Sequence, residues 1–182
     1  MDQAKVLHDA LHQYVHRQGD VFVATDLPIE PGDGGPPMVA RHVVALGTRP
    51  HPRERWVVAD EGAPEIVILE RGAAGDLKRY EKLGVSELFI YDRGARVIDG
   101  YWLGPGGFAK ITALDDGRMA SEELRLVLGF VEVPDQGAVL RWFKRDGTML
   151  ETPDETEAHR RAKIARLIEA REREIEEELG GG

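Results

Sequence analysis

The pattern of apolar and polar positions predicts a chain that opens with a helix and continues mainly as strands. Apolar residues recur at spacings of three and four from Leu7 to Tyr14, which predicts an amphipathic helix over residues 3–17. Short apolar runs bounded by Gly, Pro and Asp then predict four strands of one mixed sheet, at 20–27, 39–46, 65–70 and 87–92. The third run is apolar almost throughout, as expected for a strand that is buried on both faces.

A short charged segment over 75–83 predicts the helix that joins the third and fourth strands, near the N-terminal helix. After residue 92, further strand-like runs separated by glycine-containing turns predict antiparallel pairing, at 96–103, 107–112, 125–133 and 138–143. Together these elements define an α/β (α+β) class, with a mixed central sheet flanked by helices and followed by an antiparallel meander. We expect this body to cover residues 1–152.

The predicted tail, residues 153–182, differs from the body because its helix is charged on nearly every side. A narrow apolar stripe follows one face of a helix predicted over 156–179, and its members are Ile164, Leu167, Ile168, Ile175 and Leu179. Such a stripe indicates either a helix that docks on the body or remains solvated, or a short coiled-coil contact with a second copy or another protein. A homodimer or a protein partner bound through 156–179 is therefore a candidate.

Composition narrows the class of protein. The chain of 182 residues has a net charge of −9, which argues against a protein that coats nucleic acid, although it leaves a nuclease open. It has no cysteine, so disulfides and thiolate metal sites are excluded. We expect no membrane span and no signal peptide, and a cytoplasmic location, because no long apolar run occurs.

The segment from Pro64 to Asp92 carries the candidate chemistry. Glu70 ends an apolar strand, and the following helix carries Asp76 and Lys78. Carboxylates at neighbouring strand ends hold Mg²⁺ through oxygen ligands, and a nearby lysine assists at the scissile phosphate. This arrangement is typical of metal-dependent phosphodiesterases.

The body, from about residue 7 to residue 155, resembles the bacterial Uma-two family of proposed restriction endonucleases, within the PD-(D/E)XK nuclease superfamily. The resemblance is carried by LKRYEKLGVSELFIYD, by VARHVVALG and by the closing LRWFKRDGTMLETPDE. It implies a restriction-endonuclease-like core, DNA as the ligand and Mg²⁺ as the cofactor of an active member. It also implies that His42 and Glu70 lie close together at one end of the sheet.

The motif departs from the family where the metal ligands are implied. Arg41-His42 stands in place of the family's Pro-Asp, and imidazole is a poor ligand for Mg²⁺. The family's helical lysine corresponds to Asp76, and Lys78 lies two residues away. We therefore expect a catalytically impaired protein that acts as a binding or assembly module. The alternative is an active Mg²⁺-dependent DNA endonuclease with rearranged ligands.

Each candidate residue also has a structural interpretation. His42 is either a core or strand-end histidine, or a contact to an ion or phosphate. Glu70 is either a remaining metal ligand or a partner for Arg71 or Lys78. Asp76 and Lys78 are typical of a helix N-terminal acid and a solvated lysine.

Two further clusters could bind ligands but are more typical of surface. The histidines at i, i+4 and i+8, which could hold a transition metal, are His8, His12 and His16. The chain has one local basic cluster, formed by Arg49, His51, Arg53 and Arg55. It could bind phosphates, but it is more typical of a proline-rich surface loop.

Overall fold

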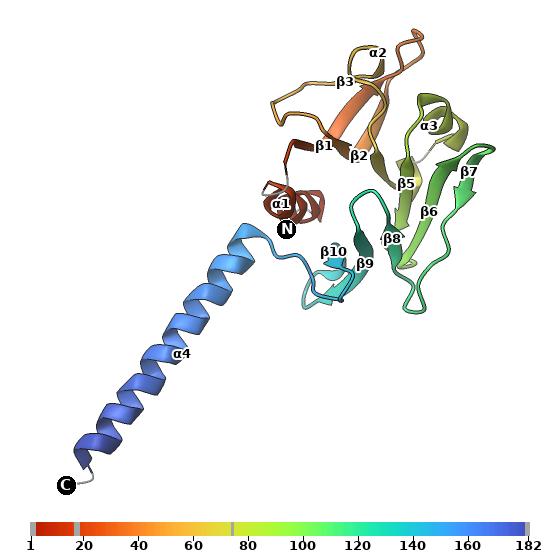
Figure 1. Ribbon diagram of the computed structural model, residues 1–182. Helices are drawn as coiled ribbons and strands as arrows, with labels where there is room; N and C mark the ends of the chain where they lie inside the picture. Colours follow the sequence, from red (N-terminus) through yellow and green to blue (C-terminus); the bar gives the residue numbers. More distant parts are fainter. Residues whose placement is uncertain (1–2, 17–18, 74, 181–182) are drawn as a thin grey trace. The chain divides into compact units, whose positions relative to one another are not determined.

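The computed structural model describes residues 3–16, 19–73 and 75–180 (Figure 1). The chain divides into two compact units, Met1–Leu150 and Glu151–Gly182. The second unit contains one helix, α4 (Pro153–Gly180). The elements of the first unit are α1 (Gln3–Val15), β1 (Val21–Glu30), β2 (Met38–Leu46), β3 (Trp56–Val57), α2 (Val58–Glu61), β4 (Ile66–Glu70), the 3-10 turn η1 (Arg71–Ala73), α3 (Leu77–Leu83), β5 (Glu87–Asp92), β6 (Val97–Gly104), β7 (Gly107–Lys110), β8 (Met119–Ser121), β9 (Leu126–Val133) and β10 (Gly137–Lys144).

Within the described ranges, seven strands form one mixed sheet in the order β3-β1-β2-β4-β5-β6-β7. β1, β2 and β4 pair antiparallel, and α3 then crosses over so that β5 pairs parallel with β4. β6 and β7 continue the sheet as antiparallel strands. The prediction that the four apolar runs share one mixed sheet is confirmed, and so is the α+β class.

The large sheet is covered on both faces, because successive residues of β4 point in opposite directions and all four before Glu70 are buried. Ile66 and Ile68 belong to the apolar cluster that contains Leu11 of α1. Val67 belongs to a second cluster, which contains Tyr80 of α3. The expectation that the two helices lie near each other is therefore wrong: they pack on opposite faces.

A second sheet forms from β8, β9 and β10, all antiparallel, in the order β10-β9-β8. It packs on the same cluster as α1, where Trp142 of β10 is fully buried. The Trp142 ring meets Phe89 of β5 edge to face, with ring centroids 6.3 Å apart. The predicted meander is thus split between two sheets, and β8 was not predicted because its three residues carry no periodic signal.

Glu87 links the two sheets through hydrogen bonds. This residue opens β5, is only 4% exposed, and accepts hydrogen bonds from the Ser121 hydroxyl at 2.5 Å and the Glu122 amide at 2.7 Å. Burial raises the pKa of the Glu87 carboxyl, although these hydrogen bonds oppose the rise. The turn after β8 is therefore fastened to the start of a core strand.

Local sequence decides where α3 and α4 begin and end. α3 begins two residues later than expected, since Asp76 is its N-cap, and it ends at Gly84, whose φ of 83° is left-handed. α4 begins at Pro153, three residues earlier than expected, because proline fits the first helical turn. Thr152 and Glu155 form a reciprocal capping box, with each backbone amide donating to the other side chain.

The predicted bounds of the N-terminal and C-terminal helices can be compared with the structure only in part. The N-terminal helix was predicted to reach residue 17, which lies outside the described residues; α1 ends at Val15. The side chain of Leu179 is likewise outside the described side chains. None of the helices in the described chain is both long and apolar enough to cross a membrane.

Candidate functional site

The register of the sheet brings His42 and Glu70 to neighbouring strands. His42 of β2 lies directly opposite Ile68 of β4, and Glu70 follows two residues later at the end of the same strand. Residues opposite each other or two apart on a strand share a face of the sheet. His42 is buried and Glu70 is exposed, so together they span the boundary between core and solvent at this strand end.

Arg41 dominates the electrostatics of this strand end. Asp26 of β1 adopts a left-handed φ of 50° between two ladder pairs, and Arg41 donates to its carboxylate at 2.7 Å. The Arg41 guanidinium also lies within hydrogen-bonding reach of the Tyr91 hydroxyl. The hydrogen bond to Asp26 raises the pKa of Arg41, so this side chain remains a fixed cation.

Tyr91 connects that cation to Glu70, because Tyr91 on β5 lies beside Glu70 in the parallel ladder. Burial raises the pKa of the Tyr91 hydroxyl, the charge of Glu70 raises it further, and Arg41 opposes the rise. Asp26, Arg41, Tyr91 and Glu70 therefore form one electrostatic group, which we call the strand-end cluster. Sequence analysis missed Asp26 and Tyr91 as members.

The strand-end cluster does not fit Mg²⁺. That ion takes hard oxygen ligands in near-octahedral geometry, whereas the cluster offers the Glu70 carboxylate and a guanidinium, and the adjacent strand adds only the His42 imidazole. The Asp26 carboxylate is already bonded to Arg41. Across the described residues, no group of three or more His, Cys, Asp or Glu side chains is arranged to hold a metal ion. We derive no hydrolytic step through a metal here.

Asp76 and Lys78 occupy structural positions on α3. The Asp76 carboxylate accepts a hydrogen bond from the Lys78 amide at 3.0 Å, as an N-cap does. The Lys78 side chain is exposed and forms no ion pair in the part of the chain that is described. The geometry therefore gives both residues the roles of a helix cap and a solvated lysine.

Arg71 does not serve as a partner of Glu70. It reaches Asp99 at 2.5 Å and Asp92 at 3.4 Å, and Lys110 bonds to Asp99 at 2.9 Å. Hydrogen bonds from Lys110 and Arg71 lower the pKa of Asp99. The two cations, Arg71 and Lys110, neutralise the two carboxylates, Asp92 and Asp99. This group therefore has no net charge with which to attract an ionic ligand.

Two arginines of the basic segment before β3 make contacts with other parts of the fold. The Arg53 guanidinium lies 4.3 Å from the centre of the Phe22 ring and 5.1 Å from that of Trp56, and it pairs with Glu61 at 2.6 Å. Arg55 pairs with Glu30 at 3.0 Å. Arg49, His51 and Arg55 are exposed, as a surface loop predicts, whereas Arg53 ties the segment to β3 and α2, a role that the sequence did not predict.

The histidines of α1 stack along its surface. The ring centroids of His8 and His12 are 5.7 Å apart, and those of His12 and His16 are 6.0 Å apart. Burial lowers the pKa of His8, whereas His12 and His16 are exposed. These three side chains form no metal-binding group in the described structure.

Comparison with known proteins adds no assignment. No family model matches the chain, and no curated protein matches it significantly in sequence.

Proposed function

We propose that this chain is a nuclease-fold protein that has lost phosphodiester hydrolysis and acts as a binding and assembly module. The observation that carries the proposal is the fixed Arg41 cation, which pairs with Asp26 and acts on Tyr91, the neighbour of Glu70 in the parallel ladder. A guanidinium that already neutralises the Asp26 carboxylate removes a negative charge that a divalent ion would need. The order of a helix, antiparallel strands, a crossover helix and a parallel strand agrees with the fold that the resemblance implies.

The first prediction concerns metal binding and cleavage. We expect Mn²⁺ to bind more weakly than about 1 mM, a binding free energy of only about 4 kcal/mol. Plasmid DNA incubated with the protein in Mg²⁺ or Mn²⁺ should remain intact, and Glu70→Ala should behave identically. Cleavage that disappears in Glu70→Ala would instead establish the active endonuclease, with DNA as its substrate.

The assembly part of the proposal concerns α4. The four described apolar side chains of its stripe are between 42% and 61% exposed: Ile164, Leu167, Ile168 and Ile175. Charge is also distributed unevenly along the helix, with a basic first half and an acidic second half. Residues 157–168 carry four Arg or Lys side chains and one Glu, whereas residues 169–178 carry six Glu and two Arg.

This charge division favours a second copy of α4 in antiparallel orientation. In that arrangement the basic half of each helix lies against the acidic half of the other. Ile164 of one copy then lies beside Ile175 of the other, so the apolar stripes and the charges match in the same register. A parallel pair would set like charges against each other.

The second prediction tests this pairing by light scattering. We expect the full chain to dimerise at micromolar concentrations, and Ile168→Glu to weaken dimerisation at least about tenfold, or about 1.4 kcal/mol. Ala162→Glu adds the same charge on the opposite side of the helix and should have no such effect. A wild-type chain that stays monomeric would refute self-association, and equal effects of both variants would refute the stripe.

A further inference from the structure

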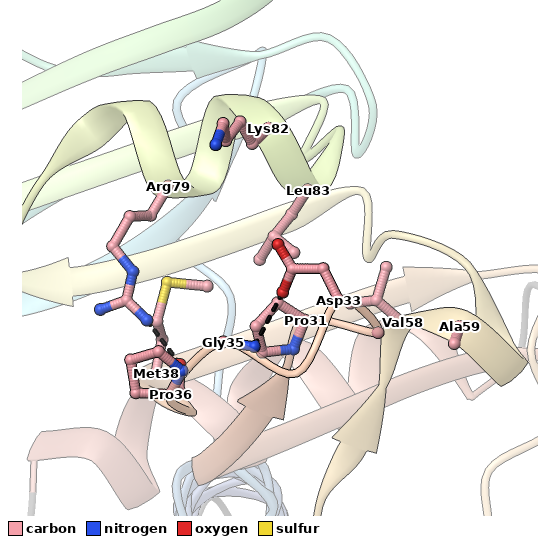
Figure 2. Close-up of a pocket in the computed structure, with 11 residues that line it drawn as sticks. Pro31, Asp33, Gly35, Pro36, Met38, Val58, Ala59, Arg79, Lys82 and Leu83 are labelled. Atoms are coloured by element: carbon pink, nitrogen blue, oxygen red, sulfur yellow. Dashed lines mark hydrogen bonds between the residues drawn. The ribbon is translucent and has the colours of Figure 1, made fainter.

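A cavity of about 520 Å³ lies between α3, α2 and the loop that joins β1 to β2 (Figure 2). This volume falls within the range of small-molecule sites. Its apolar lining is provided by Pro31, Pro36, Met38, Val58, Ala59 and Leu83. The cavity contains no member of the strand-end cluster, so it is independent of the proposed function.

One wall of the cavity carries two positively charged side chains. Arg79 and Lys82, one helical turn apart on α3, both line it (Figure 2). Neither pairs with a carboxylate among the described residues; the Arg79 guanidinium donates instead to the Pro36 carbonyl at 2.5 Å. Because the whole chain has a charge of −9, two such cations on one wall favour an anionic ligand.

The opposite wall carries a hydrogen-bond acceptor. The Asp33 carboxylate accepts from the Gly35 amide at 2.9 Å, which holds it at the cavity (Figure 2). A carboxylate has more acceptor sites than this one bond uses. It therefore suits a ligand whose body carries hydroxyl or amino donors away from its negative group.

The loop that forms this wall approaches α2 closely. A Cβ atom added to Gly32 would lie 2.6 Å from that of Ala59, so only glycine allows the loop to approach α2 this closely. Gly34 has a left-handed φ of 76°, and Pro31 and Pro36 stand at the two ends of this glycine-rich segment.

We propose that this cavity binds a nucleoside monophosphate. Its phosphate lies against Arg79 and Lys82, which supply charge-assisted hydrogen bonds. Its planar base packs on the apolar lining, and Asp33 accepts a hydrogen bond from a sugar hydroxyl or a base amino group.

The probe for a binding test is adenosine 5′-monophosphate, titrated into the wild-type chain by calorimetry. Lys82→Gln should weaken binding about tenfold, as expected for the loss of one charge-assisted hydrogen bond. Lys78→Gln is the matched control, because Lys78 is an exposed lysine of the same helix that does not line the cavity. Adenosine, which lacks the phosphate, should bind at least about tenfold more weakly than the monophosphate.

A further variant, Val58→Phe, keeps both cations and narrows the cavity with an aromatic ring, so it should weaken binding. Melting temperatures of all variants, measured alongside, separate loss of binding from loss of folding. The proposal is overturned if the monophosphate does not bind the wild-type chain, if adenosine binds equally well, or if Lys78→Gln weakens binding as much as Lys82→Gln.

Discussion

Replacement of Glu87 by alanine is expected to lower the free energy of unfolding by about 3 kcal/mol, since it leaves one buried hydroxyl and two part-buried amides without an acceptor. The donors are the Ser121 hydroxyl and the amides of Glu122 and Glu123, the last at 3.3 Å. Ser121 also accepts from the Leu124 amide, so the whole turn after β8 depends on Glu87. Urea unfolding at neutral pH measures the loss.

Glu87→Gln is the matched control, because its amide oxygen still accepts from the backbone amides and its NH₂ group can donate to Ser121. We expect this variant to lose less than about 1.5 kcal/mol at neutral pH. A loss as large as that of the alanine variant would show that the charge, rather than the acceptor, stabilises the turn.

The same residue gives stability a defined pH dependence. Because burial raises the pKa of Glu87, the folded chain holds a proton here at pH values where the unfolded chain has released it. The stabilising contribution is therefore complete below the ordinary carboxyl pKa and is lost as the pH rises through the raised value. The wild-type free energy of unfolding should fall over that window relative to Glu87→Gln. An identical pH profile for the two chains would contradict the raised pKa.

The fold was predictable where a strand or helix is defined by its own periodicity. The run that became β4 is apolar at consecutive positions, which only burial on both faces explains, and the structure buries it in this way. β3 and α2 were not predictable, because two strand residues and one helical turn have no periodicity. They depend on Arg53, which contacts residues distant in sequence.

The candidate site was predictable only in outline. The order of the strands was enough to place His42 and Glu70 on neighbouring strands. The role of Arg41 could not be predicted, because it depends on the left-handed turn at Asp26 and on the register that sets Tyr91 beside Glu70. Asp76 was ambiguous in sequence for a different reason: an acid before a short helix fits both a cap and a metal ligand.

The double variant Arg41→Ser/His42→Asp is expected to bind Mn²⁺ at least about tenfold more tightly than the wild-type chain. It removes the fixed cation, frees the Asp26 carboxylate and supplies a carboxylate on the strand next to Glu70. Carboxylates at positions 26, 42 and 70 then stand in place of an imidazole and an ion-paired acid, and carboxylate oxygens are the ligands that Mn²⁺ and Mg²⁺ take. Titration followed by the electron paramagnetic resonance of free Mn²⁺ measures the gain.

A second readout follows from the burial of position 42. An added carboxylate that is buried without a partner destabilises the apo form, so bound Mn²⁺ should raise the melting temperature of the double variant and leave that of the wild-type chain unchanged.

Adding Glu70→Ala to the double variant should remove the gain in affinity. If the gain persists without Glu70, or never appears, then positions 42 and 70 do not share one site, and the family alignment that pairs them is wrong. If the gain depends on Glu70, the wild-type chain lacks a metal site because of two neighbouring substitutions on β2 rather than because its fold differs.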